Sequence, residues 1–221
     1  MERIHSAAEL PFDQIRFAAI AIRAIDEKQR HAGIFHVDSD AKTLQLLHLA
    51  MHCDLRNAGP SNAYLWIDPQ VPAPRLRQVS AVCRQVWRSN GRDLPFGFSP
   101  PNDCFDEKTG KFLFGPTRFG LTCANFVLAV FQRAGLRLVN YETWPADRPG
   151  DKEWQTAIIQ MLRDSGLASS QHLEAMEGEV ANAAVRYRPE EVAGAALATS
   201  LPTSFEQVVE ASALVLQRLI G

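Results

Sequence analysis

One cysteine, Cys123, stands where a nucleophile could be activated, at the start of the stretch Thr122-Cys-Ala-Asn-Phe-Val127. A threonine is a typical helix N-cap, the apolar residues that follow recur at helical spacing, and Gly135 is placed to end the helix. A thiol in the first helical turn lies at the positive end of the helix dipole, beside backbone N–H groups that can hold an oxyanion. Cys123 is therefore a candidate nucleophile, with its pKa expected to be depressed. The alternative is a packing role, because free cysteine is often buried as a small apolar residue.

Histidines cluster in one part of the chain, since four of the six fall between residues 31 and 52. His31 opens one apolar run and His48 lies in the middle of the next, so on neighbouring antiparallel strands the two lie side by side. If the Cys123 helix packs on that sheet, one imidazole accepts the thiol proton and the other orients it. His36 and His52 are interpreted as surface or hydrogen-bonded structural residues.

A metal site is the alternative reading of the same histidines. His48 and His52 have the i, i+4 spacing of a helical metal pair, but the glutamate of the His-Glu-x-x-His motif is missing and the surrounding residues favour a strand. A hydrolase that binds a metal through His31, His48 and His52 therefore stays a third hypothesis. The cysteine mechanism needs no cofactor.

An antiparallel meander followed by helices is the arrangement that the hydrophobic pattern predicts. Helical spacing after Pro72 predicts a helix that ends at Asn90-Gly91, and an irregular, aromatic-rich loop from residue 93 to 119 precedes Cys123, where it could cover a site. The C-terminal third shows little chemistry, and a capping box is expected at Thr203-Ser-Phe-Glu206. The expected strands span 15–25, 31–37, 44–51 and 63–67, and the C-terminal helices about 152–165, 169–184 and 205–220.

Size and composition fit one globular domain. The 221 residues are 46% hydrophobic and 22% charged with a net charge of -2, which gives no sign of a nucleic-acid or membrane surface. The four cysteines form no CxxC pair, and the N-terminus lacks the pattern of a signal peptide. We expect a cytoplasmic protein or an effector exported without a signal peptide, with no integral membrane segment.

Two motifs resemble those of the NlpC-like papain superfamily. His31-Ala-Gly-Ile-Phe35 followed by Leu46-Leu-His-Leu-Ala50 is similar to its paired histidine strands, and the Cys123 stretch is similar to its cysteine helix. The histidines precede the cysteine, as in the circularly permuted branch that includes the lecithin retinol acyltransferase-like proteins and various bacterial amidases. The resemblance implies Cys123 as nucleophile, His31 as general base and His48 as the third member. It covers about residues 15 to 135.

The chain departs from that pattern between the two histidines. Extra residues around 38–43 lengthen the usual tight hairpin, and the glycine that follows the aromatic residue of the first strand is absent. The register between His31 and His48 is therefore left open by the sequence.

Together these observations predict an α+β, papain-like domain over residues 1–221. A small antiparallel sheet packs against the cysteine helix in a core of about 15–135, with helices over about 150–221. The expected activity is cysteine-dependent hydrolysis or acyl transfer at an amide, ester or thioester bond, with a peptide, isopeptide or acyl-lipid substrate and no nucleic acid. The alternative of another class is a non-catalytic binding or interaction module on the same fold, with the loop of residues 96–119 as its docking surface.

Overall fold

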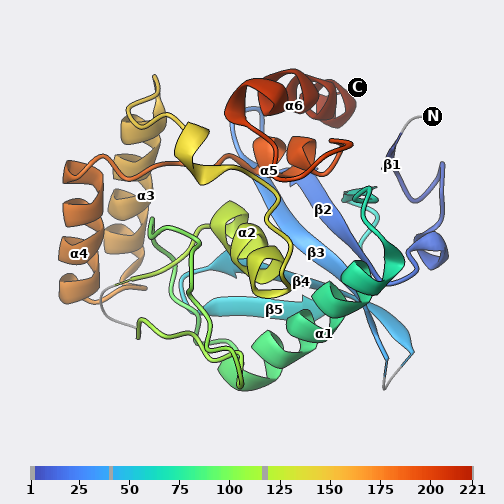
Figure 1. Ribbon diagram of the computed structural model, residues 1–221. Coiled ribbons are helices and arrows are strands. Elements are labelled where there is room, and N and C mark those ends of the chain that lie inside the picture. The colour runs from blue at the N-terminus through green and yellow to red at the C-terminus, as the bar shows by residue number, and fades with distance from the viewer. Residues whose placement is uncertain (1–2, 40–41, 116–118, 221) are drawn as a thin grey trace.

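The computed structural model describes residues 3–39, 42–115 and 119–220. These residues form an α+β fold in which one antiparallel sheet of six strands is combined with six α-helices (Figure 1). The predicted mixed fold with an antiparallel sheet is confirmed. No helix in the described ranges is long and apolar enough to span a membrane.

The sheet has the strand order β1-β6-β2-β3-β4-β5, so its middle is the predicted meander. Strands β2, β3, β4 and β5 follow one another along the chain and pair with their neighbours in that order. The strand bounds are β1 Ile4–His5, β2 Ala18–Ala24, β3 Arg30–Asp38, β4 Thr43–Met51, β5 Asp54–Ala58 and β6 Leu65–Ile67.

Four helices cover one face of this sheet. In Figure 1, α1 and α2 lie across β3, β4 and β5, while α5 and α6 lie over β2 and β3. Helices α3 and α4 pack on each other beside the sheet. The helix bounds are α1 Ala73–Asn90, α2 Cys123–Arg133, α3 Asp151–Ser165, α4 Ser170–Ala181, α5 Pro189–Ala195 and α6 Phe205–Ile220, with short 3-10 turns at Phe12–Gln14 and Tyr141–Thr143.

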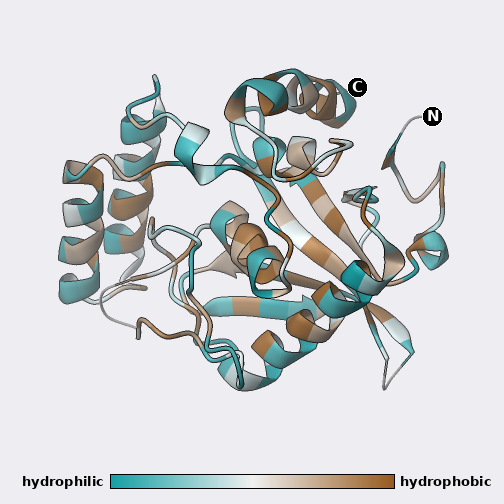
Figure 2. Cartoon of the chain, in the orientation of Figure 1, coloured by the Kyte–Doolittle hydropathy of each residue, from teal (hydrophilic) through white to brown (hydrophobic). Residues whose placement is uncertain are grey.

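Alternation along the central strands sorts their side chains between two cores. Ala32 and Ile34 of β3 belong to the large core under the helices, whereas Phe35 belongs to a smaller core on the opposite face. The apolar residues appear as brown bands on the central strands and on α2 (Figure 2). Because side chains alternate at every residue of a strand, His31 lies on the face of Phe35 and not on the helix-covered face.

The cysteine helix is the element that the sequence predicted most closely. It begins at Cys123, the Thr122 side chain caps it by accepting a hydrogen bond from the Asn125 N–H, and Gly135 follows its end with a φ of +72°. Eleven residues long, α2 is buried over its first nine, from Cys123 to Phe131. The apolar pattern thus encoded a central helix of the core.

Several details of the structure differ from the expectations. Strand β5 was not predicted, because an edge strand this polar lacks the apolar alternation of the others. Helix α5 was not predicted, being only seven residues long. The capping box of α6 lies one residue later than expected, since Ser204 and Gln207 exchange the hydrogen bonds.

Candidate active site

The two histidines that the sequence singled out share a hydrogen bond. His31 on β3 and His48 on β4 are both buried, and His31 Nε2 lies 2.8 Å from His48 Nδ1. Their rings meet nearly at right angles, with centroids 4.9 Å apart. The pairing that the sequence left open is therefore present in the structure.

The longer connection between the strands does not disturb this pairing. The β3–β4 ladder runs from Asp38 opposite Thr43 to Ile34 opposite Leu47, so the extra residues lie in the hairpin end. Beyond Leu47 the two strands are paired only with their outer neighbours, His31 with Arg23 of β2 and His48 with Arg56 of β5. The imidazoles therefore meet where the ladder between β3 and β4 stops.

Gly33 is what lets His48 come close to β3. A Cβ atom on Gly33 would lie 2.8 Å from the Cβ of His48 and 3.1 Å from the carbonyl oxygen of Leu47. Real Cβ atoms do not approach neighbouring atoms so closely, so any other residue would force the strands or the side chain to shift. The glycine of the His31-Ala-Gly-Ile-Phe35 motif thus has a steric reason to be there.

Cys123 lies at the N-terminus of α2, and it reaches this part of β3 from the helix-covered face of the sheet. The Ala32 backbone N–H donates a hydrogen bond toward the Cys123 thiol. Ala32 directly follows His31, so the thiol lies beside the backbone from which the His31 side chain projects. Within the described residues, the thiol is hydrogen-bonded to neither imidazole. In a site without substrate, catalytic hydrogen bonds are often long or poorly aligned.

Burial controls the charge state of all three groups. Burial raises the pKa of the Cys123 thiol, against the opposing effects of the Ala32 and Ala124 N–H groups and of the Arg186 charge. Burial also lowers the pKa of His31 to about 3, helped by the charges of His48, Arg23 and Arg56. The pKa of His48 falls to about 4 for the same main reason.

The thiol of Cys123 and the imidazoles of His31 and His48 are therefore all neutral in the resting protein. The expectation of a depressed thiol pKa is wrong for this resting state, because desolvation of the fully enclosed thiol outweighs the helix terminus. A proton must leave Cys123 as it reacts, and His31 Nδ1 is the ring nitrogen that the His48 hydrogen bond leaves available.

Tyr64 closes the far side of the histidine pair. Its ring centroid lies 6.3 Å from that of His31 and 6.2 Å from that of His48, and the Arg23 guanidinium lies over the Tyr64 ring, 5.1 Å from its centroid. Burial raises the pKa of the Tyr64 hydroxyl. Tyr64 was not predicted as a site residue, although it is the second residue of the predicted strand 63–67.

A small cavity of about 40 Å³ lies beside Cys123, and much of its wall comes from the C-terminal third of the chain. Phe96 and Arg30 line it together with Trp154, Arg186 and Tyr187. The statement that the C-terminal third shows little chemistry is therefore wrong. These residues are distant from Cys123 in the sequence and carry no motif, so only the fold reveals them.

Arg186 is held at this cavity by a network of ion pairs. Its guanidinium lies 3.8 Å from the centroid of the Trp154 ring and binds Asp151 at 3.1 Å. Asp151 is buried and also pairs with Arg148 at 3.0 Å and Arg188 at 2.8 Å. The cation beside Cys123 is thus fixed in position by α3 and by the segment before α5.

The remaining histidines lie apart from this pair. His36 is buried on the helix-covered face and its Nε2 lies 2.8 Å from Asn57 Oδ1, which makes it the hydrogen-bonded structural histidine that was predicted. His52 stacks on His172, with centroids 4.6 Å apart. No group of three or more His, Cys, Asp or Glu side chains in the described ranges is arranged to hold a metal ion. The structure does not bring His52 together with His31 and His48.

Comparison of the chain with models of known protein families, with curated proteins and with solved structures finds no match.

Proposed function

We propose that the protein is a cysteine-dependent hydrolase or acyltransferase of papain-like architecture, acting on an amide, ester or thioester bond. The observation that carries the proposal is the hydrogen-bonded pair of His31 and His48 beside Cys123 at the start of α2. A nucleophile, a base and a group that orients the base are the three parts that such chemistry needs.

The geometry of the hydrogen bond supports one division of roles within the pair. When His31 Nε2 carries the proton and donates to His48 Nδ1, the Nδ1 atom of His31 is a free acceptor. His31 is therefore the general base, and His48 fixes its tautomer and ring orientation. His48 also stabilises the imidazolium that forms when His31 accepts the proton.

The reaction proceeds through an acyl-enzyme. His31 Nδ1 takes the thiol proton as Cys123 Sγ attacks the substrate carbonyl, and the carbonyl oxygen becomes an oxyanion beside the Cys123 N–H at the positive end of α2. Collapse of this intermediate breaks the bond to the leaving group, which receives the proton from His31. Water or another nucleophile, deprotonated by His31, then attacks the thioester and restores the thiol.

The test is the rate at which iodoacetamide alkylates Cys123 between pH 6 and 9, followed by mass spectrometry of the Cys123 peptide. At pH 7 we expect His31→Gln to slow this alkylation at least about tenfold, because only the thiolate is alkylated and His31 is its proton acceptor. His36→Gln is the matched control, since His36 is equally buried but lies on the other face of the sheet. Equal rates in the wild type and in both variants would contradict the proposal.

The other three thiols are internal references in the same experiment. Burial raises the pKa of Cys53, raises that of Cys83, and raises that of Cys104 to about 12. Because their pKa values are raised, their alkylation should be slow, and His31→Gln should leave it unaffected. A Cys123→Ser variant verifies the assignment of the reactive peptide.

A binding module on the same fold is the second candidate, favoured by one observation. The loop before α2 exposes Leu113 by 55%, Phe114 by 39% and Phe119 by 41%, and the Phe114 and Phe119 rings are 5.4 Å apart. Exposed apolar side chains that gather in this way are typical of contact surfaces. This candidate replaces the first if Cys123 alkylation is indifferent to His31.

A further inference from the structure

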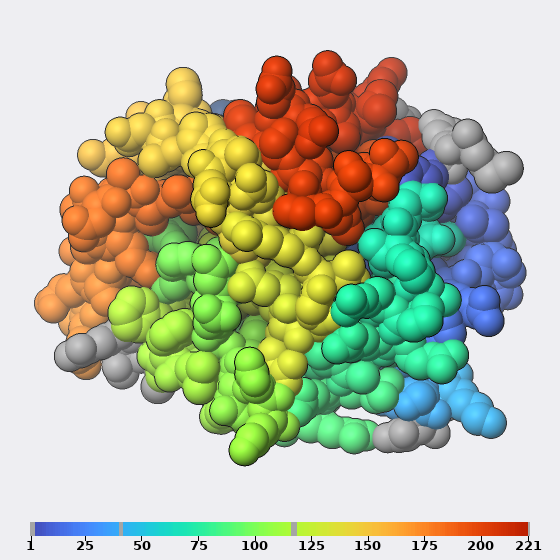
Figure 3. Space-filling model, viewed as in Figure 1, coloured from blue at the N-terminus to red at the C-terminus, as the bar shows by residue number. Residues whose placement is uncertain are grey.

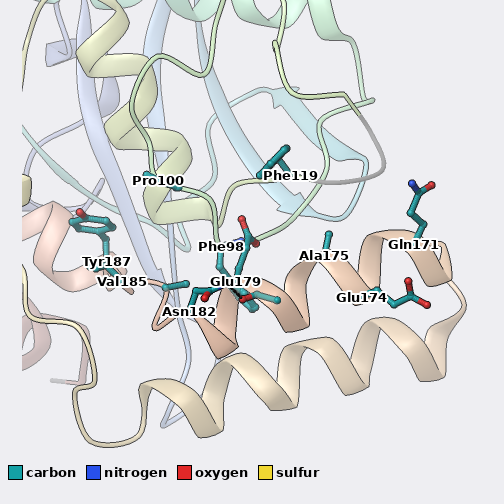
Figure 4. Close-up of a pocket in the computed structure, with 12 residues that line it drawn as sticks. Phe98, Pro100, Phe119, Gln171, Glu174, Ala175, Glu179, Asn182, Val185 and Tyr187 are labelled. Carbon is teal, nitrogen blue, oxygen red and sulfur yellow. Dashed lines mark hydrogen bonds between the residues drawn. The ribbon is translucent and has the colours of Figure 1, made fainter.

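A second cavity, far larger than the one at Cys123, lies between α4 and the loop that precedes α2. Its volume is about 780 Å³, and the loop contributes Phe98, Pro100 and Phe119 to its wall. Figure 4 shows these loop residues above the helix, with Ala175 and Glu179 rising from α4 and Tyr187 at one end. In the space-filling view, the light green atoms of the loop lie beside the orange atoms of α4 (Figure 3). A cavity of this size accommodates a small organic molecule.

The walls of this cavity are apolar and aromatic. Phe98 and Tyr187 are buried, whereas Phe119 is partly open to solvent at the mouth. Val185 and Ala175 complete the apolar surface. Aromatic faces carry negative charge density, so such a wall attracts an apolar group and also a cation placed over a ring.

The charged residues of the cavity have one sign. Glu179 and Glu174 line it, and no lysine or arginine is among the described residues that do so. Glu179 is half-buried, and its two oxygens accept hydrogen bonds from the Phe98 N–H at 3.0 Å and from the Ser99 hydroxyl at 2.6 Å. Both donors are neutral groups, and Glu179 forms no ion pair with any described residue.

Within the described ranges, no cationic side chain compensates the negative charge of a carboxylate in that position. Burial raises the pKa of Glu179, which is the cost of holding an anion away from water without a cationic partner. An incoming cation would remove that cost, and the second lone pairs of the carboxylate oxygens remain to accept its hydrogen bonds.

We propose that this cavity binds a small apolar molecule carrying a positive charge, with the apolar part against Phe98, Phe119 and Tyr187 and the charge at Glu179. The proposal does not depend on catalysis by Cys123. Tyr187 lines both this cavity and the small one at Cys123, and the Phe98 ring lies 6.0 Å from that of Trp154, so the two cavities adjoin. A ligand in the larger cavity therefore lies next to residues that also line the small cavity at Cys123.

The test is equilibrium binding of three probes of similar shape, measured by isothermal titration calorimetry on the full chain carrying Cys123→Ser. The probes are 2-phenylethylammonium, 2-phenylethanol and 3-phenylpropanoate. We expect the ammonium to bind at least about tenfold more tightly than the alcohol, and the carboxylate to bind more weakly than both. This selectivity needs no variant at the cavity.

Variants at the cavity locate the probe. Glu179→Gln keeps an acceptor for Ser99 and should reduce the preference for the ammonium over the alcohol to less than about twofold. Glu177→Gln, on the same helix but paired with Arg163 at the surface, is the matched control and should leave the preference intact. Ala175→Trp fills the cavity and should abolish binding of every probe.

Three results would overturn the proposal. They are equal affinity for the ammonium and the alcohol, tighter binding of the carboxylate, and binding that survives Ala175→Trp. Because the protein under test lacks the Cys123 thiol, these outcomes are separate from the alkylation experiment, and either proposal can fail while the other holds.

Discussion

At the residue scale, the proposed mechanism depends on the contact between two imidazoles more than on the thiol itself. His31 is only a base at Nδ1 if its Nε2 proton has an acceptor, and His48 Nδ1 is that acceptor at 2.8 Å. The burial that lowers the pKa of both histidines also strengthens the hydrogen bond between them, because water does not compete for it. Changes that move His48 should therefore reduce the reactivity of Cys123.

Replacing His48 tests this directly. His48→Gln keeps a side-chain oxygen that can accept the Nε2 proton of His31, whereas His48→Ala leaves that buried donor without a partner. We expect alkylation of Cys123 at pH 7 to fall at least about tenfold in His48→Ala and to recover partly in His48→Gln. Equal rates in the two variants would show that His48 does not orient His31.

A substitution at Gly33 perturbs the histidine pair without altering either imidazole. Gly33→Ala places a methyl group 2.8 Å from the Cβ of His48, so we expect the free energy of unfolding to fall by about 1–3 kcal/mol and Cys123 alkylation to slow. Gly59→Ala is the control, because nothing lies within 4 Å of a Cβ there. Urea denaturation and the alkylation rate are measured on both variants, and a Gly33→Ala protein that behaves like Gly59→Ala would refute the steric argument.

At the scale of elements, α2 is held in place by its first residues. The Thr122 hydroxyl oxygen accepts the Asn125 N–H at 3.0 Å and the hydroxyl donates to Asn125 Oδ1 at 3.0 Å, while Asn125 Nδ2 donates to the Ser99 carbonyl at 2.7 Å. This chain of hydrogen bonds ties the helix start to the loop of residues 93–119. The cap thus fixes both the dipole end and the residue that carries the thiol.

Removing the cap should destabilise the protein. We expect Thr122→Ala to lower the free energy of unfolding by about 1 kcal/mol, and Thr122→Ser to restore most of the loss. Denaturant unfolding of the two variants measures this difference. A Thr122→Ser protein as unstable as Thr122→Ala would mean that the methyl group, and not the hydroxyl, stabilises the helix start.

The elements that the sequence predicted are those whose pattern is local. Helical spacing and a threonine cap were enough for α2, and apolar alternation bounded by turns was enough for β3 and β4. Strand β5 and helix α5 were not predicted. Strand β5 is a polar edge strand, and α5 is too short to show a helical period. The histidine pair was predicted, but the neutral resting state was not, since desolvation depends on the whole surrounding fold. Likewise Arg186 and Tyr187 reach the Cys123 cavity only through the packing of distant segments.

At the scale of the whole molecule, the C-terminal helices are joined to the site by buried charges. Asp151 at the start of α3 binds Arg148, Arg186 and Arg188, and Glu191 of α5 accepts from Arg148 and from Trp144 Nε1. Both carboxylates are buried, so each arginine left without its partner would remain as an uncompensated charge.

Neutralising Asp151 should therefore be costly. We expect Asp151→Asn to reduce the free energy of unfolding by about 3 kcal/mol, measured by urea denaturation. Asp164→Asn, on the exposed face of the same helix, is the control and should change it by less than about 0.5 kcal/mol. A small effect of Asp151→Asn would mean that water screens the network.

The protein should also lose stability in acid. The folded-state pKa values of His31 and His48, about 3 and about 4, lie below the ordinary value of 6.5, so the unfolded chain takes up protons first as the pH falls. Stability from these groups is complete above about pH 6.5 and declines as the pH drops toward 4. At pH 5 the loss is about 2 kcal/mol for each imidazole.

Urea unfolding at pH 8 and pH 5 measures this decline. A double variant, His31→Gln with His48→Gln, should lose less stability between the two pH values than the wild type does. An identical decline in both proteins would mean that the two imidazoles are protonated in the folded state at pH 5.

Ala32 lies where β3 and β4 separate, and its backbone amide can be observed by NMR spectroscopy. The Ala32 amide donates toward the Cys123 sulfur, so its proton senses whether that sulfur is a thiol, a thiolate or an acyl thioester. In a ¹⁵N–¹H correlation spectrum, the Ala32 cross-peak should therefore move with the chemical state of Cys123. A backbone signal next to His31 would then report each stage of the proposed reaction without a labelled substrate.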